Sequence, residues 1–331
     1  MTPTEPIDFV LLWVDGDDPA WQREFRAAKH AAHEDASPIR YRDWRNLQYW
    51  FRAVERFAPW VRRIHFITWG HLPAWLDTAH PKLHVVRHGD YIPAAYLPTF
   101  NSNTIELNLH RIEGLAERFV LFNDDTFLLR PCRPGDFFRR GLPCDMARLS
   151  IVQPSPVAHI VFNDLTLINA AHRKNDAVRR HPGKWFSLRY GAGDLLKSLL
   201  LLPWSAFPGI YDPHMPQPYL RSRFARAWEL WDAELDASCR NRFRTPTDHS
   251  HRLVRYDMLC RGEFMPRSLG DCRTMTPDDT TADAVARTIE EARCRMICLH
   301  DSPQIADFER VCERLRTAFD RLLPEKSSYE R

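Results

Sequence analysis

The sequence predicts an α/β fold with a mostly parallel, doubly wound sheet and a largely helical cap. The first observation is that short apolar runs alternate with longer amphipathic segments through the first part of the chain. The second is that the later part is irregular, more helical and interrupted by proline clusters. We place a soft boundary at residue 145, so that residues 1–145 form the sheet unit and residues 146–331 the cap. A single integrated domain remains the alternative.

The expected strands and helices alternate in the sheet unit. The short apolar runs expected to form strands are residues 7–14, 62–68, 83–86 and 118–122. Two longer segments, residues 20–34 and 47–57, have apolar side chains at helical spacing. This alternation is typical of a parallel sheet that is covered by helices on both faces.

A further short helix is expected at residues 104–112, after a loop rich in proline and aromatic residues. Asn103 or Thr104 could cap its first turn. Helical spacing would place Glu106 and His110 one turn apart on the same face. A solvated ion pair or a supporting role beside a site would each explain these two residues.

Two apolar segments are expected to lie in the cap and at the end of the chain. Residues 195–204 are strongly apolar, but Lys197 interrupts them and Pro203 stops them, so we expect a buried helix. Residues 307–323 carry apolar side chains along one helical face. We expect that face to pack on the core, with a peripheral membrane contact as the alternative.

Composition excludes some classes of function. The chain has 331 residues, 46 basic and 43 acidic, with a net charge of +3 and without clustered basic stretches, so we expect no nucleic-acid partner. The eight cysteines form no CxxC pair, which is typical of reduced thiols in a cytoplasmic protein. The apolar run at the N-terminus ends in acids and is too short for a signal peptide or a membrane span.

The motif FNDD carries the strongest chemical signal. The apolar run at residues 118–122 leads directly into Asn123, Asp124 and Asp125. Ligands of open α/β sheets bind outside the carboxyl ends of strands, and paired carboxylates there suit Mg²⁺ or Mn²⁺ bound to phosphates. Taken alone, two adjacent acids after a strand more often form a turn or a helix cap than a metal site. With a metal, the motif predicts a nucleotide-diphosphate substrate.

Longer blocks in the same order resemble the four conserved regions of the Stealth family, from Ile7 to about Pro303. That family comprises bacterial capsular and exopolysaccharide sugar-phosphate transferases and the catalytic part of the lysosomal-enzyme N-acetylglucosamine-1-phosphotransferase. The blocks that carry the resemblance are IDFVLLWVDGDDPAW, RYRDWRNLQYWFRAVERFAPWVRRIHFITWGHLPAWL with LPTFNSNTIELNLHRIEGLAERFVLFNDDTFL, HMPQPYLRSRFARAWELWDAEL through NRFRTPTD, and MICLHDSP.

The resemblance implies a Rossmann-like, glycosyltransferase-A-like sheet and a sugar-phosphate transfer. A hexose 1-phosphate, with N-acetylhexosamine 1-phosphate as the expected case, would pass from a UDP-sugar to a sugar hydroxyl. The acceptor would be an oligosaccharide or a growing polysaccharide in capsule or exopolysaccharide synthesis. The product would be a phosphodiester, with release of UMP. By analogy with the family, we expect a cytoplasmic protein at the inner face of the membrane, with peripheral association there or with capsule machinery.

The resemblance also assigns catalytic and metal-binding roles. Asp124, Asp125 and Asp301 are the expected ligands of Mg²⁺ or Mn²⁺. His214 is the expected general base, because an imidazole can take a hydroxyl proton near neutral pH. Arg244 is expected to bind the transferred phosphoryl group bidentately, with Asp125 completing the catalytic set.

Further residues are expected to bind the substrates. Asn123 could bond a phosphate or a metal-bound water through its amide, and Asp15 is assigned to the donor site. Arg40, Arg42 and Asp43 match the second conserved block. In the block expected to receive the acceptor, His181 and Lys184 are the two candidates.

Four other positions are expected to be structural or to depart from the family pattern. Asp17 and Asp18 are expected to cap the helix that begins near Pro19. Trp13 is expected in the core. His300 occupies the position before Asp301 where the family has asparagine, so the contact that Asp301 makes with the donor or the metal is in question.

Two other functions stay open from the sequence. A metal-dependent glycosyltransferase needs the same diphosphate site but directs the attack to the anomeric carbon and releases UDP. A non-catalytic polysaccharide-assembly protein could retain the fold without turnover. The intact FNDD motif, His214 and Arg244 favour an enzyme.

Overall fold

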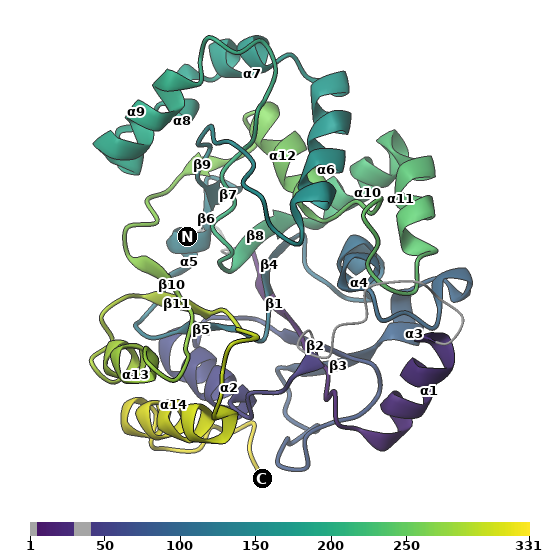
Figure 1. The fold of residues 1–331 in the computed structure, drawn as a ribbon, viewed down its shortest axis with the longest axis vertical. Helices are drawn as coiled ribbons and strands as arrows, with labels where there is room; N and C mark the ends of the chain where they lie inside the picture. Colours follow the sequence, from purple (N-terminus) through teal and green to yellow (C-terminus); the bar gives the residue numbers. More distant parts are fainter. Residues whose placement is uncertain (1–4, 30–40) are drawn as a thin grey trace.

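A computed structural model describes residues 5–29 and 41–331. Its central sheet has five strands in the order β3-β2-β1-β4-β8 (Figure 1). The strands are β1 (Ile7–Leu12), β2 (Ile64–Thr68), β3 (Leu83–Arg87), β4 (Arg118–Phe122) and β8 (Gln217–Leu220). The first four pair in parallel, and β8 pairs antiparallel with β4. The α/β class and the mostly parallel sheet are therefore confirmed.

The order of the strands reverses between β1 and β4. From β1 the chain adds β2 and β3 on one side of the sheet and then returns to the other side of β1 with β4. The two strands are in register, with Leu11 opposite Phe122. At such a switch point the connections diverge, which leaves a crevice outside the carboxyl ends of the two strands. Residues that follow Leu12 and Phe122 therefore face this crevice.

Helices from both ends of the chain cover one face of the sheet. They are α2 (Leu47–Phe57), α13 (Ala282–Glu290) and α14 (Phe308–Leu322) (Figure 1). The apolar face predicted for the last helix is buried, and Phe319 stacks on Tyr49 with ring centroids 5.2 Å apart. The expected packing of this helix on the core is thus confirmed. The helix α1 (Pro19–Lys29) begins after Asp18, whose carboxylate accepts the backbone N–H groups of Ala20 and Trp21.

Two small sheets join strands from residues 126–145 to strands from residues 265–299. One has the order β10-β11-β5, formed by β10 (Cys272–Met275), β11 (Met296–Leu299) and β5 (Thr126–Leu128). The other consists of β6 (Phe138–Arg139), β7 (Leu142–Asp145) and β9 (Met265–Pro266). Strands from both sides of residue 145 are thus hydrogen-bonded in all three sheets, since β8 belongs to the central one.

The stretch from residue 158 to residue 260 is rich in helices. Its helices are α6 (Ala158–Ala171), α7 (Lys174–Arg180), α8 (Pro182–Trp185), α9 (Ala192–Leu200), α10 (Arg221–Leu230), α11 (Asp232–Cys239) and α12 (Arg252–Cys260). The shorter helices elsewhere are α3 (His88–Tyr91), α4 (Ser102–Leu107) and α5 (Pro134–Phe137). In Figure 1 the helices α7, α8 and α9 lie at the upper edge, away from the central sheet.

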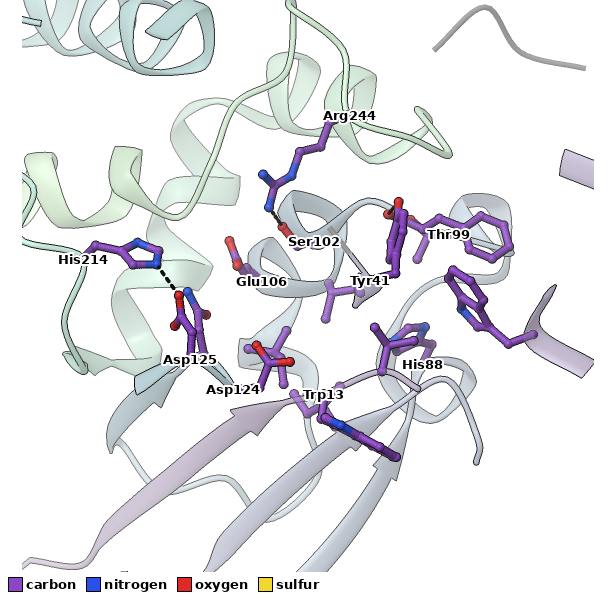
Figure 2. A pocket seen from close by; sticks show the side chains of 17 residues that line it. Trp13, Tyr41, His88, Thr99, Ser102, Glu106, Asp124, Asp125, His214 and Arg244 are labelled. Carbon is purple, nitrogen blue, oxygen red and sulfur yellow. Dashed lines mark hydrogen bonds and ion pairs between the residues drawn. The ribbon is translucent and has the colours of Figure 1, made fainter. Parts of the chain in front are cut away.

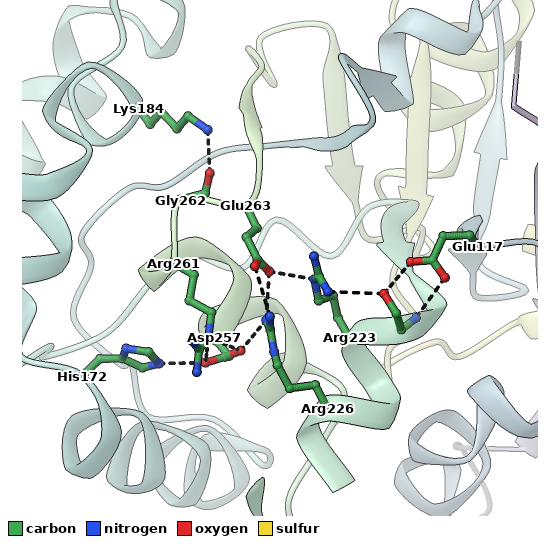
Figure 3. A network of polar contacts seen from close by, with 10 residues as sticks. Glu117, His172, Lys184, Arg223, Arg226, Asp257, Arg261, Gly262 and Glu263 are labelled. Atoms are coloured by element: carbon green, nitrogen blue, oxygen red, sulfur yellow. Dashed lines mark hydrogen bonds and ion pairs between the residues drawn. The ribbon is translucent and has the colours of Figure 1, made fainter. Parts of the chain in front are cut away.

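A polar network holds the cap together (Figure 3). The carboxylate of Asp257 on α12 accepts bonds from Arg226 at 2.6 Å and Arg261 at 2.9 Å, and lies 2.7 Å from the imidazole of His172. Arg226 also reaches Glu263 at 2.9 Å. Since Asp257 is nearly buried, these bonds compensate for its removal from water.

One expectation about the cap is wrong. Residues 195–204 were expected to be a buried helix, yet Leu196, Leu199 and Leu200 on α9 are more than half exposed. Periodicity shows which side chains share a face of a helix, but it does not show whether another element covers that face. Ser198, on the other side of α9, is the buried residue of this helix.

All eight cysteines have free thiols, which agrees with the expectation of reduced cysteines. Across residues 5–29 and 41–331, the helices are too short or too polar to cross a membrane.

Candidate active site

A cavity of about 260 Å³ opens at the carboxyl ends of β1 and β4, at the switch point of the sheet. Figure 2 shows the acids after β4 on one side of the cavity, with His214 and Arg244 reaching in from the later half of the chain. The lining residues are Leu12, Trp13, Val14, Trp21, Tyr41, Ile67, His88, Thr99, Phe100, Ser102, Ile105, Glu106, Asn123, Asp124, Asp125, His214 and Arg244. Five of the predicted site residues thus share one cavity.

The two acids after β4 have different surroundings. Burial raises the pKa of Asp124 to about 8, and the negative charges of Asp125 and Asp43 add to this effect. The Oδ1 atom of Asp125 is buried without a hydrogen-bond partner among the described residues. An orphaned carboxylate oxygen beside a second acid is costly unless a cation neutralises it. These two residues therefore fit a divalent ion, as the sequence predicts.

Three side chains from the later half of the chain surround Asp125. The group consists of Asp125, His214, Cys298 and His300, whose ligand atoms all lie within 4.8 Å of one another. The Asp125 Oδ2 atom is 3.2 Å from His214 Nε2 and 3.4 Å from the Cys298 sulfur, which donates to it. These four side chains could hold a metal ion through oxygen, nitrogen and sulfur atoms.

The sequence predicts Asp125 and His214 but not the other two members of this group. Cys298 is on β11, and His300 follows the end of that strand. Alternate residues of an extended segment point to the same side, so the two positions can face Asp125 together. The pattern Cys-x-His was the available signal, and it was weak because the pairing of β11 with β5 is not visible in the sequence.

The backbone of His214 has φ of 43°, in the left-handed region that is uncommon for residues with a side chain. Burial lowers the pKa of His214, but its hydrogen bond with Asp125 and the charges of Asp125 and Asp212 outweigh burial and raise the pKa. The positive φ and the long-range bond place this imidazole beside the acids. Backbone strain of this kind is concentrated at functional sites.

Asp301 has a different partner from the one expected. The Arg42 guanidinium binds its carboxylate bidentately, with one bond of 2.9 Å from Nε to Oδ2, and also donates to the Ser302 carbonyl. Asp301 lines a neighbouring cavity with Asp43, Asp124 and Asp125 but is not in the four-residue group around Asp125. His300, one position earlier, is the member of that group. The structure thus pairs Asp301 with Arg42 and brings His300 to Asp125.

Asp15 and Asp17 of the first conserved block line neither cavity, but their charges act on Asp43, which lines the second one. The carboxylate of Asp15 accepts the backbone N–H of Asp17 at 2.9 Å, and its own N–H donates to His71 at 2.7 Å. Burial raises the pKa of Asp43, and the charges of Asp15 and Asp17 raise it further. Asp18 caps α1 as predicted, whereas Asp17 makes no such bond among the described contacts. The predicted residue Arg40 lies outside the described residues.

On the opposite wall of the main cavity, Arg244 donates to the Ser102 hydroxyl (Figure 2). Glu106 lies on the same wall, 3.6 Å from His251 Nε2. Burial raises the pKa of Glu106, although the positive charges of Arg244 and Arg252 oppose this effect. An arginine, a serine and a buried acid therefore face the acids that follow β4.

The expectation that Glu106 and His110 share a helical face is wrong. The helix α4 ends at Leu107, so residues 106 and 110 do not share a helical face. The N-cap residue of α4 also differs from the prediction. The side chain of Asn101, and not that of Asn103 or Thr104, accepts a hydrogen bond at the start of the helix, and its donor is the backbone N–H of Asn103. Asn101 and Asn103 both donate to the buried carboxylate of Asp248, and these long-range bonds decide where the helix begins.

The structure does not bring His181 and Lys184 to the cavity. The Lys184 ammonium donates to the backbone carbonyls of Gly262 and Phe264, which ties α8 to the end of α12 (Figure 3). The ring of His181 packs against Gly262, and a Cβ atom added to that glycine would lie 2.5 Å from the ring. Both residues connect parts of the cap. Trp13 is buried and stacks on Phe66, as expected of a core residue, but it also lines the cavity.

Comparison with known proteins decides the family. The family models "Stealth protein CR1, conserved region 1" and "Stealth protein CR2, conserved region 2" match residues 5–33 and 40–144. A capsular polysaccharide phosphotransferase WcwK of Streptococcus pneumoniae is 39% identical over 336 residues, covering all of both chains. The chain belongs to the Stealth family.

Two other relatives also match over nearly the whole chain. An exopolysaccharide phosphotransferase cps2G of Lactiplantibacillus plantarum is 37% identical, covering 98% of this chain and 96% of its own. A receptor polysaccharide phosphotransferase WefC of Streptococcus oralis is 36% identical, covering 98% of this chain and 99% of its own. His214, Arg244 and Cys298 lie beyond the ranges of the two family models but within these full-length similarities.

Proposed function

We propose that this Stealth-family protein transfers a hexose 1-phosphate from a UDP-sugar to a sugar hydroxyl in capsule or exopolysaccharide synthesis. The observation that carries the proposal is the Asp124–Asp125 pair at the switch point, in a chain whose full-length relatives are named polysaccharide phosphotransferases. N-acetylhexosamine 1-phosphate is the group that we expect to be transferred. The fold would serve as a glycosyltransferase-A-like scaffold that binds the nucleotide outside β1 and β4.

In this reaction the acceptor oxygen attacks the phosphorus that carries the sugar. The bond from that phosphorus to the bridging oxygen of the diphosphate breaks, and UMP leaves with the bridging oxygen. A new phosphodiester joins the sugar 1-phosphate to the acceptor. The protein must therefore neutralise the diphosphate, bind the transferred phosphoryl oxygens and accept the hydroxyl proton.

A divalent ion fits beside Asp125, whose buried Oδ1 atom lacks a partner among the described residues. Asp125, Cys298 and His300 would hold this ion, with Asp124 adjacent. When bound, it supplies positive charge for the diphosphate oxygens. We propose Mg²⁺ or Mn²⁺, and the imidazole donor favours Mn²⁺ over Mg²⁺ because Mg²⁺ prefers oxygen ligands.

His214 is proposed as the general base. With a proton on Nε2 shared with Asp125 Oδ2, the other ring nitrogen is the basic atom that can take the acceptor proton. Asp125 fixes the orientation of the ring and stabilises the imidazolium after the proton has moved. This arrangement explains why burial does not depress the pKa of His214.

Arg244 is proposed to bind the transferred phosphoryl group. Its guanidinium can donate two parallel hydrogen bonds to phosphoryl oxygens, and the bond to Ser102 aims it into the cavity. A fixed positive charge at this position stabilises the charge that spreads over those oxygens during transfer. Asp15, Asn123, Arg42 and Asp43 are proposed to complete the donor site, with Arg42 acting through its pairing with Asp301.

The nucleotide released tests this function against its alternatives. Purified protein, Mn²⁺ or Mg²⁺ and an acceptor oligosaccharide are incubated with UDP-sugars, and the nucleotides are separated by chromatography. Release of UMP that disappears in Asp125→Ala supports the proposal. Release of UDP would indicate a glycosyltransferase, and the absence of turnover under every donor and metal condition would favour a non-catalytic assembly protein.

A further inference from the structure

The cap carries an exposed apolar surface that is unrelated to the cavity. Leu188, Leu196, Leu199, Leu200 and Trp204 are 89%, 57%, 51%, 65% and 55% exposed. We call these five residues the leucine face. They lie on α9 and in the segments on either side of it, at the edge of the molecule away from the central sheet (Figure 1). Exposed large apolar side chains that are close together in this way mark an interaction surface.

The packing of α9 fixes the direction of this face. Leu196, Leu199 and Leu200 are three and four positions apart, so they share one side of the helix. On the other side, the buried Ser198 hydroxyl accepts the backbone N–H of Leu149 at 3.2 Å. The adjoining Leu201 is buried in the cap core. The helix therefore presents its leucines outward while its inner side is held.

Basic side chains lie in the same segment of the chain as the leucine face. Residues 172–206 contain seven lysines or arginines and two aspartates, with no glutamate. One of the two acids, Asp194, is bound by Arg148 at 2.7 Å. The exposed basic side chains of this segment are Arg173, Arg179, Arg180, Arg189 and Lys197. The segment therefore exposes both apolar and positively charged side chains.

We propose that the leucine face docks on a lipid bilayer that contains anionic headgroups. Leucines on one side of a helix can enter the boundary between headgroups and acyl chains, and an exposed tryptophan suits the same depth. The five exposed cations match the negative potential of anionic lipids. Stable anchoring to a membrane takes two signals, and the segment supplies both an apolar and a basic one.

Charge argues against a second copy of this chain as the occupant. A twofold contact across the leucine face would bring two positively charged segments towards each other. Such like-charge contacts are unfavourable. A bilayer of anionic lipids instead has an apolar interior for the leucines and a negatively charged surface for the basic side chains. The inference does not depend on the proposed reaction, because none of these residues lines the cavity.

Vesicle flotation of the full chain tests the docking. We expect binding to phosphatidylcholine vesicles that contain phosphatidylglycerol, weak binding to pure phosphatidylcholine, and release at high salt. The double variant Leu199→Glu/Leu200→Glu should lower the partition coefficient more than about tenfold, and Arg179→Glu/Arg180→Glu about tenfold or more. Leu230→Glu, at a 48% exposed leucine on α10, is the matched control and should bind as the wild type.

Thermal unfolding of each variant shows whether it folds, and Trp204→Ser provides a second test if a charge variant does not. Weaker binding by Trp204→Ser would support the inference. Equal binding of wild type and folded leucine variant would overturn it, as would equal affinity for neutral and anionic vesicles. A dimer in size-exclusion chromatography that Leu199→Glu/Leu200→Glu dissociates, without vesicle binding by the wild type, would identify a second copy as the occupant and also overturn it.

Discussion

His214 Nε2 lies 3.2 Å from Asp125 Oδ2, although the two residues are 89 positions apart in the chain. The relationship depends on β8, which begins at Gln217 and pairs antiparallel with β4, the strand that ends just before the acids. The chain therefore enters β8 beside the point where it leaves β4. This pairing brings a residue of the later half to the acids of the first half.

Replacing His214 by glutamine tests its role as the base. Gln keeps a polar side chain of similar size but cannot take a proton, so kcat should fall by about 10²- to 10⁴-fold. The KM for the UDP-sugar should change little, because the side chain is not proposed to bind the donor. Steady-state kinetics with UMP as the measured product gives both values. His159→Gln, at an exposed histidine on α6, is the control, and an equal loss in the two variants would contradict the assignment.

The metal site predicts a preference among ions. His300→Asn replaces an imidazole by an amide, and Cys298→Ser replaces a sulfur by a hydroxyl, so both should weaken Mn²⁺ binding and shift the preference towards Mg²⁺. Isothermal titration of each ion into the free protein measures this without turnover, and we expect a loss of Mn²⁺ affinity of about tenfold or more for each variant. Cys272→Ser, at a thiol outside the group, is the control. Unchanged Mn²⁺ affinity in both variants would show that the ion is held elsewhere.

Arg244 is predicted to act through its planar guanidinium. Arg244→Lys keeps the charge but loses the two parallel bonds, so kcat/KM should fall at least about tenfold, and Arg244→Ala should fall further. Arg242→Lys, at an exposed arginine two positions earlier, should leave kcat/KM unchanged. If Arg242→Lys were as damaging as Arg244→Lys, the phosphoryl group would have to be bound by both residues or by the charge of the whole segment.

Because several histidines are buried, we expect the protein to lose stability in weak acid. Burial lowers the pKa of His88 to about 4, whereas an unfolded histidine titrates near 6.5. Between these two pKa values the unfolded chain binds more protons than the folded chain. The contribution of His88 to the free energy of unfolding is therefore fully present above about pH 6.5 and falls as the pH drops towards 4. For His88 this loss is at most about 3 kcal/mol. His110 and His251 have pKa values of about 4 and 3 for the same reason and add to it.

Urea unfolding at several pH values between 7 and 4.5 measures this loss. His88→Gln removes one titrating group, so its stability should depend less steeply on pH than that of the wild type. The difference between the two proteins is the relevant quantity, because Asp124 and other groups with raised pKa values oppose the trend. His159→Gln should keep the wild-type slope, and equal slopes in all three proteins would contradict the prediction.

The parallel sheet and its acids could be predicted because their signals are local. Each strand is an uninterrupted apolar run, and Asp124 and Asp125 directly follow one of them. Resemblance to a family then supplied His214 and Arg244, which share the cavity with the acids. Their arrival at one place required the pairing of β8 with β4, which no spacing in the sequence encodes.

The remaining site residues depend on contacts between distant segments. Cys298 and His300 lie beside Asp125 because β11 pairs with β5. Asp301 binds Arg42, which is 259 positions away in the sequence. Asn101 begins α4 because Asp248 holds it. The exposure of Leu199 and Leu200 also depends on which elements fold over α9. Periodicity could identify the leucine face as a face but could not show whether it is covered.

The fate of the phosphorus that carries the sugar distinguishes sugar-phosphate transfer from glycosyl transfer. A UDP-sugar labelled with ³²P at that phosphorus is incubated with the protein, divalent ion and acceptor oligosaccharide, and the products are separated. Sugar-phosphate transfer predicts that the label moves to the acceptor in a wild-type reaction and stays in the donor with Asp125→Ala. Label that instead appears in UDP, with an unlabelled glycosylated acceptor, would contradict sugar-phosphate transfer.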